Sequence, residues 1–240
     1  MNQEFYINLN TKNKYFAQPK ELLKTSPEEI QEIKEYKART NYLKNGNSKL
    51  GKGIYSFDLP SVTSCPNYSE CQDTCYAQKG RFIFGTTKKS NTKNFIIALN
   101  DLPHLQKSII KEIKKNDIRT IRIHSSGDFF SKEYFLMWVS IANKFQGVLK
   151  IFTYSKAPQI ENFNLPDNFN IIDSFIRVDP QTKILNYGAY DALKPIAKKI
   201  KGLICPITKG QYLDKPKLKE LTCTQCKYCI TKKLPLFVQH

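Results

Sequence analysis

Residues 118–156, IRTIRIHSSGDFFSKEYFLMWVSIANKFQGVLKIFTYSK, hold a strand, a helix and a second strand in sequence. The strand IRTIRIH at 118–124 ends in the turn SSGD, and Ser131 then stands as the N-cap of a helix over 131–145. The run at 149–156 predicts the next strand. This order predicts a parallel pair, because the helix carries the chain back to the starting edge of the sheet.

The same alternation extends in both directions. It predicts further strands at 53–60, 169–179 and 202–206, helices at 88–101 and 102–116, and weaker helices near 158–163 and within 187–201. The fold class is therefore α/β, a partial open (βα) barrel of about five to six parallel strands. We divide the chain into a basic helical N-terminal segment (1–50), the partial barrel (51–204) and a cysteine-rich metal-binding extension (205–240).

The strand at 118–124 places Ile121 and Ile123 on one face and Arg122 and His124 on the other. Because a parallel strand covered on both sides should be apolar on both faces, we expect the charged face to line the inside of an open barrel. The active site is expected at the carboxyl ends of the strands.

Composition narrows the class of protein. A hydrophobic fraction of 40% and an aromatic fraction of 12% argue against disorder. No run approaches 18 apolar residues, and the first residues lack the apolar block of a signal peptide, so we expect a cytoplasmic protein and no membrane partner. Thiols stay reduced in the cytosol, which favours metal ligation over disulfides for the seven cysteines.

The net charge of +17, from 38 basic and 21 acidic residues, predicts a polyanionic partner. Nucleic acid is the commonest polyanion in the cytosol. A codon bias toward lysine and asparagine is the alternative explanation.

The first cysteine group is Cys65, Cys71 and Cys75, spaced C-x5-C-x3-C directly after the strand at 53–60. Three thiolates can hold a 4Fe-4S cluster and leave one iron open for a substrate or cofactor. Zinc completed by a further residue, or inert thiols, are the alternatives.

The second group is C-x2-C-x2-C, with an isolated Cys-Pro upstream, and comprises Cys205, Cys223, Cys226 and Cys229. Four thiolates can enclose a second iron–sulfur cluster or a structural zinc, and the spacing does not separate these two readings.

Polar residues at the predicted strand ends are the other candidates. We assign catalytic roles to Ser126, Asp128 and Lys156, and cofactor binding to His124, Gly127, Tyr154 and Arg177. Each has a structural alternative: a turn that introduces the next helix, a hydrogen-bonded core histidine, solvated strand ends, or an ion pair of Arg177 with a neighbouring aspartate.

Three stretches carry a family resemblance: KGIYSFDLPSVTSCPNYSECQDTCYA at 52–77, RIHSSGDFFSKEYFLMWVSIA at 122–142 and FTYSK at 152–156. They resemble a family of small phage- and plasmid-encoded proteins named for a mycobacteriophage gene product. More distantly, the chain resembles the radical S-adenosylmethionine enzymes. That resemblance implies a three-cysteine cluster loop after the first strand and a methionine-binding motif, here Gly127-Asp128, after the second. The usual cysteine spacing in those enzymes is C-x3-C-x2-C, from which this chain departs.

We therefore expect an iron–sulfur enzyme of radical S-adenosylmethionine-like architecture, encoded by a mobile element and acting on or near nucleic acid. Its cofactors would be 4Fe-4S clusters and S-adenosylmethionine, and an electron-donor protein would be a further partner. The alternative is a non-catalytic nucleic-acid-binding protein with structural zinc or iron–sulfur sites.

Overall fold

The computed structural model describes residues 41–66, 75–157, 164–173, 187–188, 194, 203–206, 208–209, 213–231 and 235–238. The expected helical N-terminal segment (1–50) is described only from residue 41, and there Lys44–Asn45 form a strand and no helix is present. The expected helix near 158–163 and most of the one expected within 187–201 lie outside the described residues, as do Cys71 and Arg177.

A five-stranded sheet in the order β1-β2-β3-β4-β5 forms the centre of the fold. Its strands are β1 (Lys44–Asn45), β2 (Tyr55–Phe57), β3 (Thr120–Ile123), β4 (Lys150–Ser155) and β5 (Phe169–Asp173). Strands β2 to β5 are parallel, and β1 pairs antiparallel with β2. The α/β class is confirmed, and the sheet is open rather than closed into a barrel.

The run at 202–206 was expected as a further strand of this sheet, and that expectation is wrong. Its strand, β7 (Leu203–Ile204), belongs to a separate three-stranded sheet in the order β6-β8-β7. The other members are β6 (Tyr187–Gly188) and β8 (Pro235–Val238). The pairing of Leu203 with Pro235 is parallel and joins segments far apart in sequence, so local pattern could not reveal it.

Three long helices match the expected positions: α4 (Gly85–Asn100), α5 (Leu102–Lys115) and α6 (Lys132–Lys144). Ser131 caps α6, because its hydroxyl accepts a hydrogen bond from the Tyr134 amide at 3.2 Å. The short helices are η3 (Tyr76–Gln78), η4 (Gly80–Ile83), α9 (Pro216–Lys219), α10 (Cys223–Cys226) and η6 (Tyr228–Thr231). No helix among the described residues is long and apolar enough to cross a membrane.

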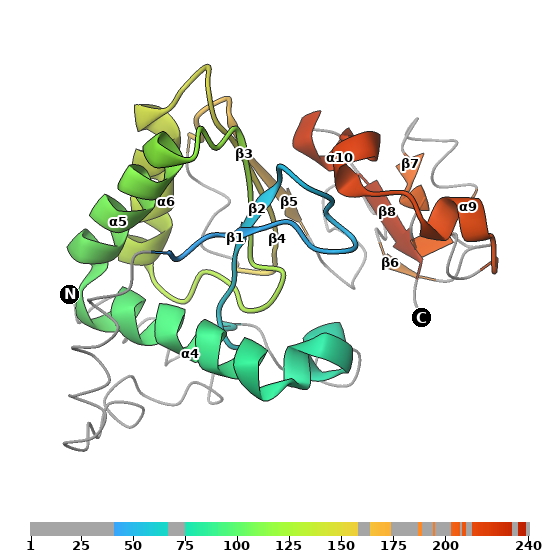
Figure 1. The fold of residues 1–240 in the computed structure, drawn as a ribbon, viewed down its shortest axis with the longest axis horizontal. Coiled ribbons are helices and arrows are strands. Elements are labelled where there is room, and N and C mark those ends of the chain that lie inside the picture. Colours follow the sequence, from blue (N-terminus) through green and yellow to red (C-terminus); the bar gives the residue numbers. More distant parts are fainter. Residues whose placement is uncertain are drawn as a thin grey trace.

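The two faces of the sheet are covered by different parts of the chain. Phe57, Ile121 and Ile151 share the face that forms the main core with the long helices, where Trp138 is fully buried. On the opposite face Phe152 packs with Leu50 and Ile54 against the C-terminal cysteine segment (Thr222–Thr231). Figure 1 shows α5 and α6 on one side of the sheet and α10 on the other. The polar face expected to line an open lumen is therefore covered by the cysteine segment.

Candidate functional site

The turn after β3 is built for close approach to the segment that follows β2. Gly127 has a φ of +79°, and a Cβ added there would lie 2.6 Å from Leu59 Cβ and would also collide with the Ser64 hydroxyl. The Leu59 amide donates a hydrogen bond to the Ser126 carbonyl at 3.0 Å. The turn at Gly127 therefore packs closely against the protein itself, where the first cysteine loop begins.

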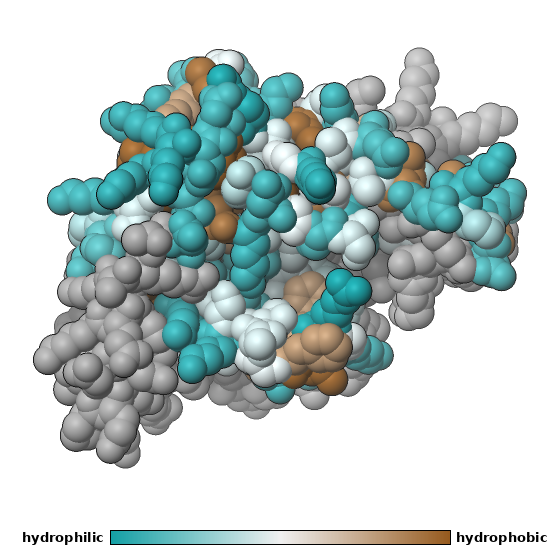
Figure 2. Space-filling model, viewed as in Figure 1, coloured by the Kyte–Doolittle hydropathy of each residue, from teal (hydrophilic) through white to brown (hydrophobic). Residues whose placement is uncertain are grey.

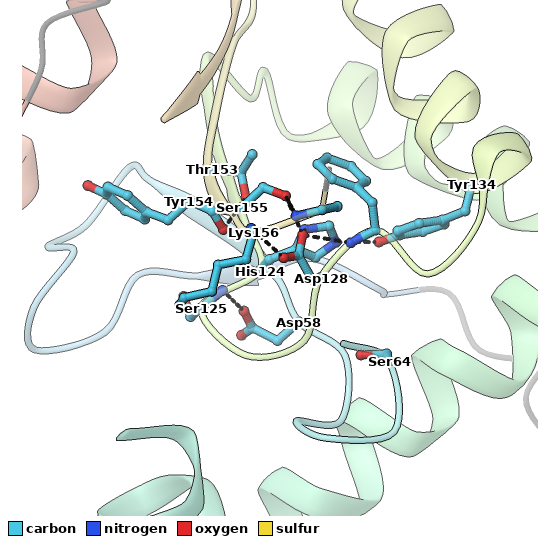
Figure 3. Close-up of polar contacts among 12 residues, drawn as sticks. Asp58, Ser64, His124, Ser125, Asp128, Tyr134, Thr153, Tyr154, Ser155 and Lys156 are labelled. Atoms are coloured by element: carbon cyan, nitrogen blue, oxygen red, sulfur yellow. Dashed lines mark hydrogen bonds and ion pairs between the residues drawn. The ribbon is translucent and has the colours of Figure 1, made fainter. Parts of the chain in front are cut away.

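Asp128 is buried at the centre of this turn (Figure 3). Its carboxylate accepts hydrogen bonds from the Phe129 amide at 2.8 Å, the Ser155 hydroxyl at 2.6 Å and the Lys156 amide at 2.8 Å. Burial raises the pKa of the Asp128 carboxyl. Three of its roughly four acceptor positions are occupied, so the side chain fastens the β3 turn to the end of β4. A contact from Asp128 to a ligand stays a prediction.

His124 lies beside Asp128 and is also buried. Its Nε2 is 2.9 Å from the Tyr134 hydroxyl, and its Nδ1 is 4.0 Å from the nearer Asp128 oxygen. Burial lowers the pKa of His124 to about 3, so the imidazole is uncharged at neutral pH. Its contacts are those of a core histidine, and cofactor binding by His124 is untested.

Asp58 joins this turn but was not singled out from the sequence. Its carboxylate accepts a hydrogen bond from the Ser125 amide at 2.8 Å, and burial raises its pKa. The available signal was its position one residue after β2, at the edge where the other candidates lie.

The first cysteine loop returns to the same edge. The pKa of the Cys65 thiol is raised to about 12, mainly by burial and also by the negative charges of Asp128 and Cys75, while the charge of Lys156 acts to lower it. Cys65 is therefore close enough to Asp128, Cys75 and Lys156 for their charges to act on its thiol. The Tyr76 hydroxyl donates a 2.6 Å hydrogen bond to the Ser125 carbonyl and ties the end of the loop to the β3 turn.

A cavity of about 340 Å³ adjoins this edge, within the size range of small-ligand sites. Ser126 lines it together with Val62, Phe82, Ile83 and Lys88. Of the predicted catalytic residues, Ser126 is thus the one that lines this cavity.

The C-terminal cysteine segment is held against the sheet by backbone groups. The Cys223 amide donates to the Lys49 carbonyl and the Thr224 amide to the Leu50 carbonyl, both at 3.0 Å. From the sheet, the Asn170 side-chain amide donates to the Cys229 carbonyl at 2.6 Å.

A second cavity, of about 50 Å³, lies where this segment meets the sheet. The residues that line it include all four late cysteines, Cys205, Cys223, Cys226 and Cys229, together with Arg122 and Tyr154. The pKa of the Cys229 thiol is raised to about 12, mainly by burial. The hydrogen bond from the Tyr154 hydroxyl and the positive charge of Arg122 act in the opposite direction.

Arg122 is the unusual residue of this cavity. It is 8% exposed, and its guanidinium carbon lies 5.1 Å from the centre of the Tyr154 ring. Within the described part of the chain its Nε is buried and has no hydrogen-bond partner. A buried cation is costly unless negative charge is near, and four thiolates would supply that charge.

As they stand, no three His, Cys, Asp or Glu side chains among the described residues form a group that could hold a metal ion. Cys71 falls outside those residues, so the first cysteine set is represented by two members. The late cysteines share one cavity without converging on one point. Their donor chemistry, and the Arg122 Nε that has no hydrogen-bond partner among the described residues, fit a thiolate-bound metal, and binding would have to draw the thiols inward.

The family model described as Gene product 88 matches residues 32–231, a span that holds both cysteine sets and the β3 turn. The chain belongs to the gene product 88 family. It is 25% identical over 217 residues to the Gene 88 protein of Mycobacterium phage D29, covering 80% of this chain and 90% of the phage protein. No solved structure matches the chain significantly. The resemblance to a phage family is confirmed, and these matches lend no support to the more distant link with radical S-adenosylmethionine enzymes.

Proposed function

We propose that this gene product 88 family member is an iron–sulfur protein that acts on or near nucleic acid. The observation that carries the proposal is the meeting of the first cysteine loop with the strand ends. The charges of Asp128, Cys75 and Lys156 all act on the Cys65 thiol, and Ser126 at the same edge lines the 340 Å³ cavity. A cluster held there by three cysteines would have an open iron next to space for a ligand.

The strand order supports this reading. Strands β2 to β5 follow one another in chain order and bring all their carboxyl ends to one edge. A strip of a (βα) barrel has that arrangement, and its ligands bind at that edge. The cluster would supply the electron, while the residues of the edge bind and orient the substrate. S-adenosylmethionine is the ligand to test first at the open iron.

The test is metal analysis after anaerobic purification. We expect iron and acid-labile sulfide, about four of each per cluster, at both cysteine sets. Cys71→Ser should remove the iron and sulfide bound by the first cysteine set, and Cys226→Ser should remove those bound by the second. Ser69→Ala, between Cys65 and Cys71 in the sequence, should leave the iron and sulfide content unchanged. Addition of S-adenosylmethionine should then change the paramagnetic resonance spectrum of the reduced wild-type cluster but not that of Cys71→Ser. Protein that holds zinc and no sulfide would overturn the proposal.

A specific observation favours a second candidate, a non-catalytic nucleic-acid-binding protein with structural zinc. His124 and Asp128 are buried and hydrogen-bonded to the protein, as structural residues are. On this reading the four late cysteines hold zinc, and Cys71→Ser has no effect on metal content.

A further inference from the structure

An exposed apolar cluster lies where η4 leads into α4. Phe84 is 57% exposed and Ile83 49% exposed, although such side chains are usually buried. In Figure 2 hydrophobic residues gather at the N-terminal end of α4, beside hydrophilic ones. A soluble domain keeps large exposed apolar side chains together mainly where something binds.

The charge around this cluster is of one sign. Residues 75–100 contain five basic residues, Lys79, Arg81, Lys88, Lys89 and Lys93, and no aspartate or glutamate. Lys79, Arg81, Lys88 and Lys89 are exposed. The partner that complements this surface is therefore an anion with apolar faces.

The surface also leads into the cavity at the sheet edge. Ile83 and Lys88 belong both to the surface and to the lining of the cavity, which Phe82 and Ser126 also line. A ligand that follows the surface could insert one group about the size of a nucleobase toward the strand ends.

We propose that this α4 surface, Lys79, Arg81, Ile83, Phe84, Lys88 and Lys89, binds single-stranded nucleic acid. Phosphates pair with the basic side chains, and a base stacks on the Phe84 ring. An exposed ring can stack on bases that are unpaired and splayed, whereas a duplex keeps its base faces covered. The inference deepens the proposed function by placing its nucleic-acid partner, and it does not depend on which metal the cysteines hold.

Fluorescence anisotropy with a labelled oligothymidylate of about 12 nucleotides tests the proposal, since such a length covers a typical single-strand site. Phe84→Ala should raise Kd about 5- to 100-fold, the loss expected for one stacked base. The double variant Lys88→Gln/Lys89→Gln should raise Kd and reduce the slope of log Kd against log salt by about 0.7 for each charge removed.

Control substitutions elsewhere on the protein distinguish binding at the α4 surface from a general effect of net charge. Val148→Ala removes another exposed apolar side chain, 47% exposed, and Lys114→Gln/Lys115→Gln removes two exposed charges from α5. Both controls should leave Kd within about twofold, with unchanged circular dichroism. A duplex of the same length should bind more weakly than the single strand at equal salt.

Equal weakening in the α5 pair, stronger binding of the duplex, or no effect of Phe84→Ala would each overturn the inference. Iron and sulfide are measured on the same samples, so the two proposals fail separately. Iron with no effect of the α4 variants rejects this surface alone, whereas zinc with a full effect of those variants rejects the iron–sulfur proposal alone.

Discussion

At the scale of single residues, His124 makes folding stability depend on pH. Its pKa is about 3 in the folded protein against about 6.5 when unfolded, because burial disfavours the charged imidazole. Between these values the unfolded chain binds the extra proton, so stability falls as pH falls from 6.5 toward 3. The slope contributed by one such group is at most about 1.4 kcal/mol per pH unit.

We expect His124→Gln to flatten this part of the stability–pH curve, measured by urea denaturation at several pH values. Asp58 and Asp128 have raised pKa values, so their contributions to the pH dependence of stability have the opposite sign to that of His124. These contributions are present in both the wild type and the variant. The exposed residue change Lys132→Gln serves as the control. A variant curve parallel to the wild-type curve between pH 6.5 and 4 would show that His124 is not the cause.

At the scale of elements, Gly127 joins the β3 turn to the segment between β2 and the first cysteine loop. Alanine there would need a left-handed φ, and its Cβ would collide with both Leu59 and Ser64. We expect Gly127→Ala to lower the free energy of unfolding by about 2–4 kcal/mol. Chemical denaturation measures this directly.

Gly147 is the matched control for that change. It also has a positive φ, +80°, but no atom lies within 4 Å of an added Cβ. Gly147→Ala should therefore cost only about 1 kcal/mol, the backbone share alone. Equal losses at the two positions would mean that the packing of the β3 turn against Leu59 contributes nothing.

At the scale of the whole molecule, Arg122 links the central sheet to the C-terminal cysteine segment. Four thiolates around a divalent metal leave a net charge of about −2, which the buried guanidinium would offset. We expect Arg122→Met to weaken metal binding about 10- to 100-fold, the usual effect of removing a supporting contact outside the ligand shell. Competition of the reconstituted protein with a zinc chelator measures this.

The apoprotein should respond differently to the same change. Without metal, Arg122 is a buried cation whose Nε has no partner among the described residues, so Met of similar length should leave stability unchanged or raise it. Arg119→Met, which removes an exposed arginine paired with Asp117 at 2.7 Å, is the control for loss of charge. Equal chelator sensitivity of wild type and Arg122→Met would refute the role of Arg122.

Local pattern was sufficient for the parts of the fold that depend on near neighbours. Helix α6 was predicted from Ser131 and its apolar spacing, and strands β3 and β4 from their alternation, because caps and periodicity act within a few residues. The same strand-end rule placed Ser126 and Lys156 at one edge with the first cysteine loop. It overlooked Asp58, which lay within the predicted strand and had no motif to mark it.

What covers each face of the sheet depends on contacts between segments that are far apart in the sequence. The sheet face that carries Arg122 was expected to line an open lumen. Instead, the Thr224 hydroxyl donates a hydrogen bond to the carbonyl of Leu50, 174 positions earlier, and the Asn170 side-chain amide donates one to the Cys229 carbonyl. Strand β7, which was expected in the main sheet, pairs with β8 in the second sheet instead. Local pattern was enough to predict the three long helices and the parallel strands of the main sheet, because caps and periodicity act between near neighbours. Which buried polar groups find partners depends on contacts between distant segments, and those are set only when the chain has folded.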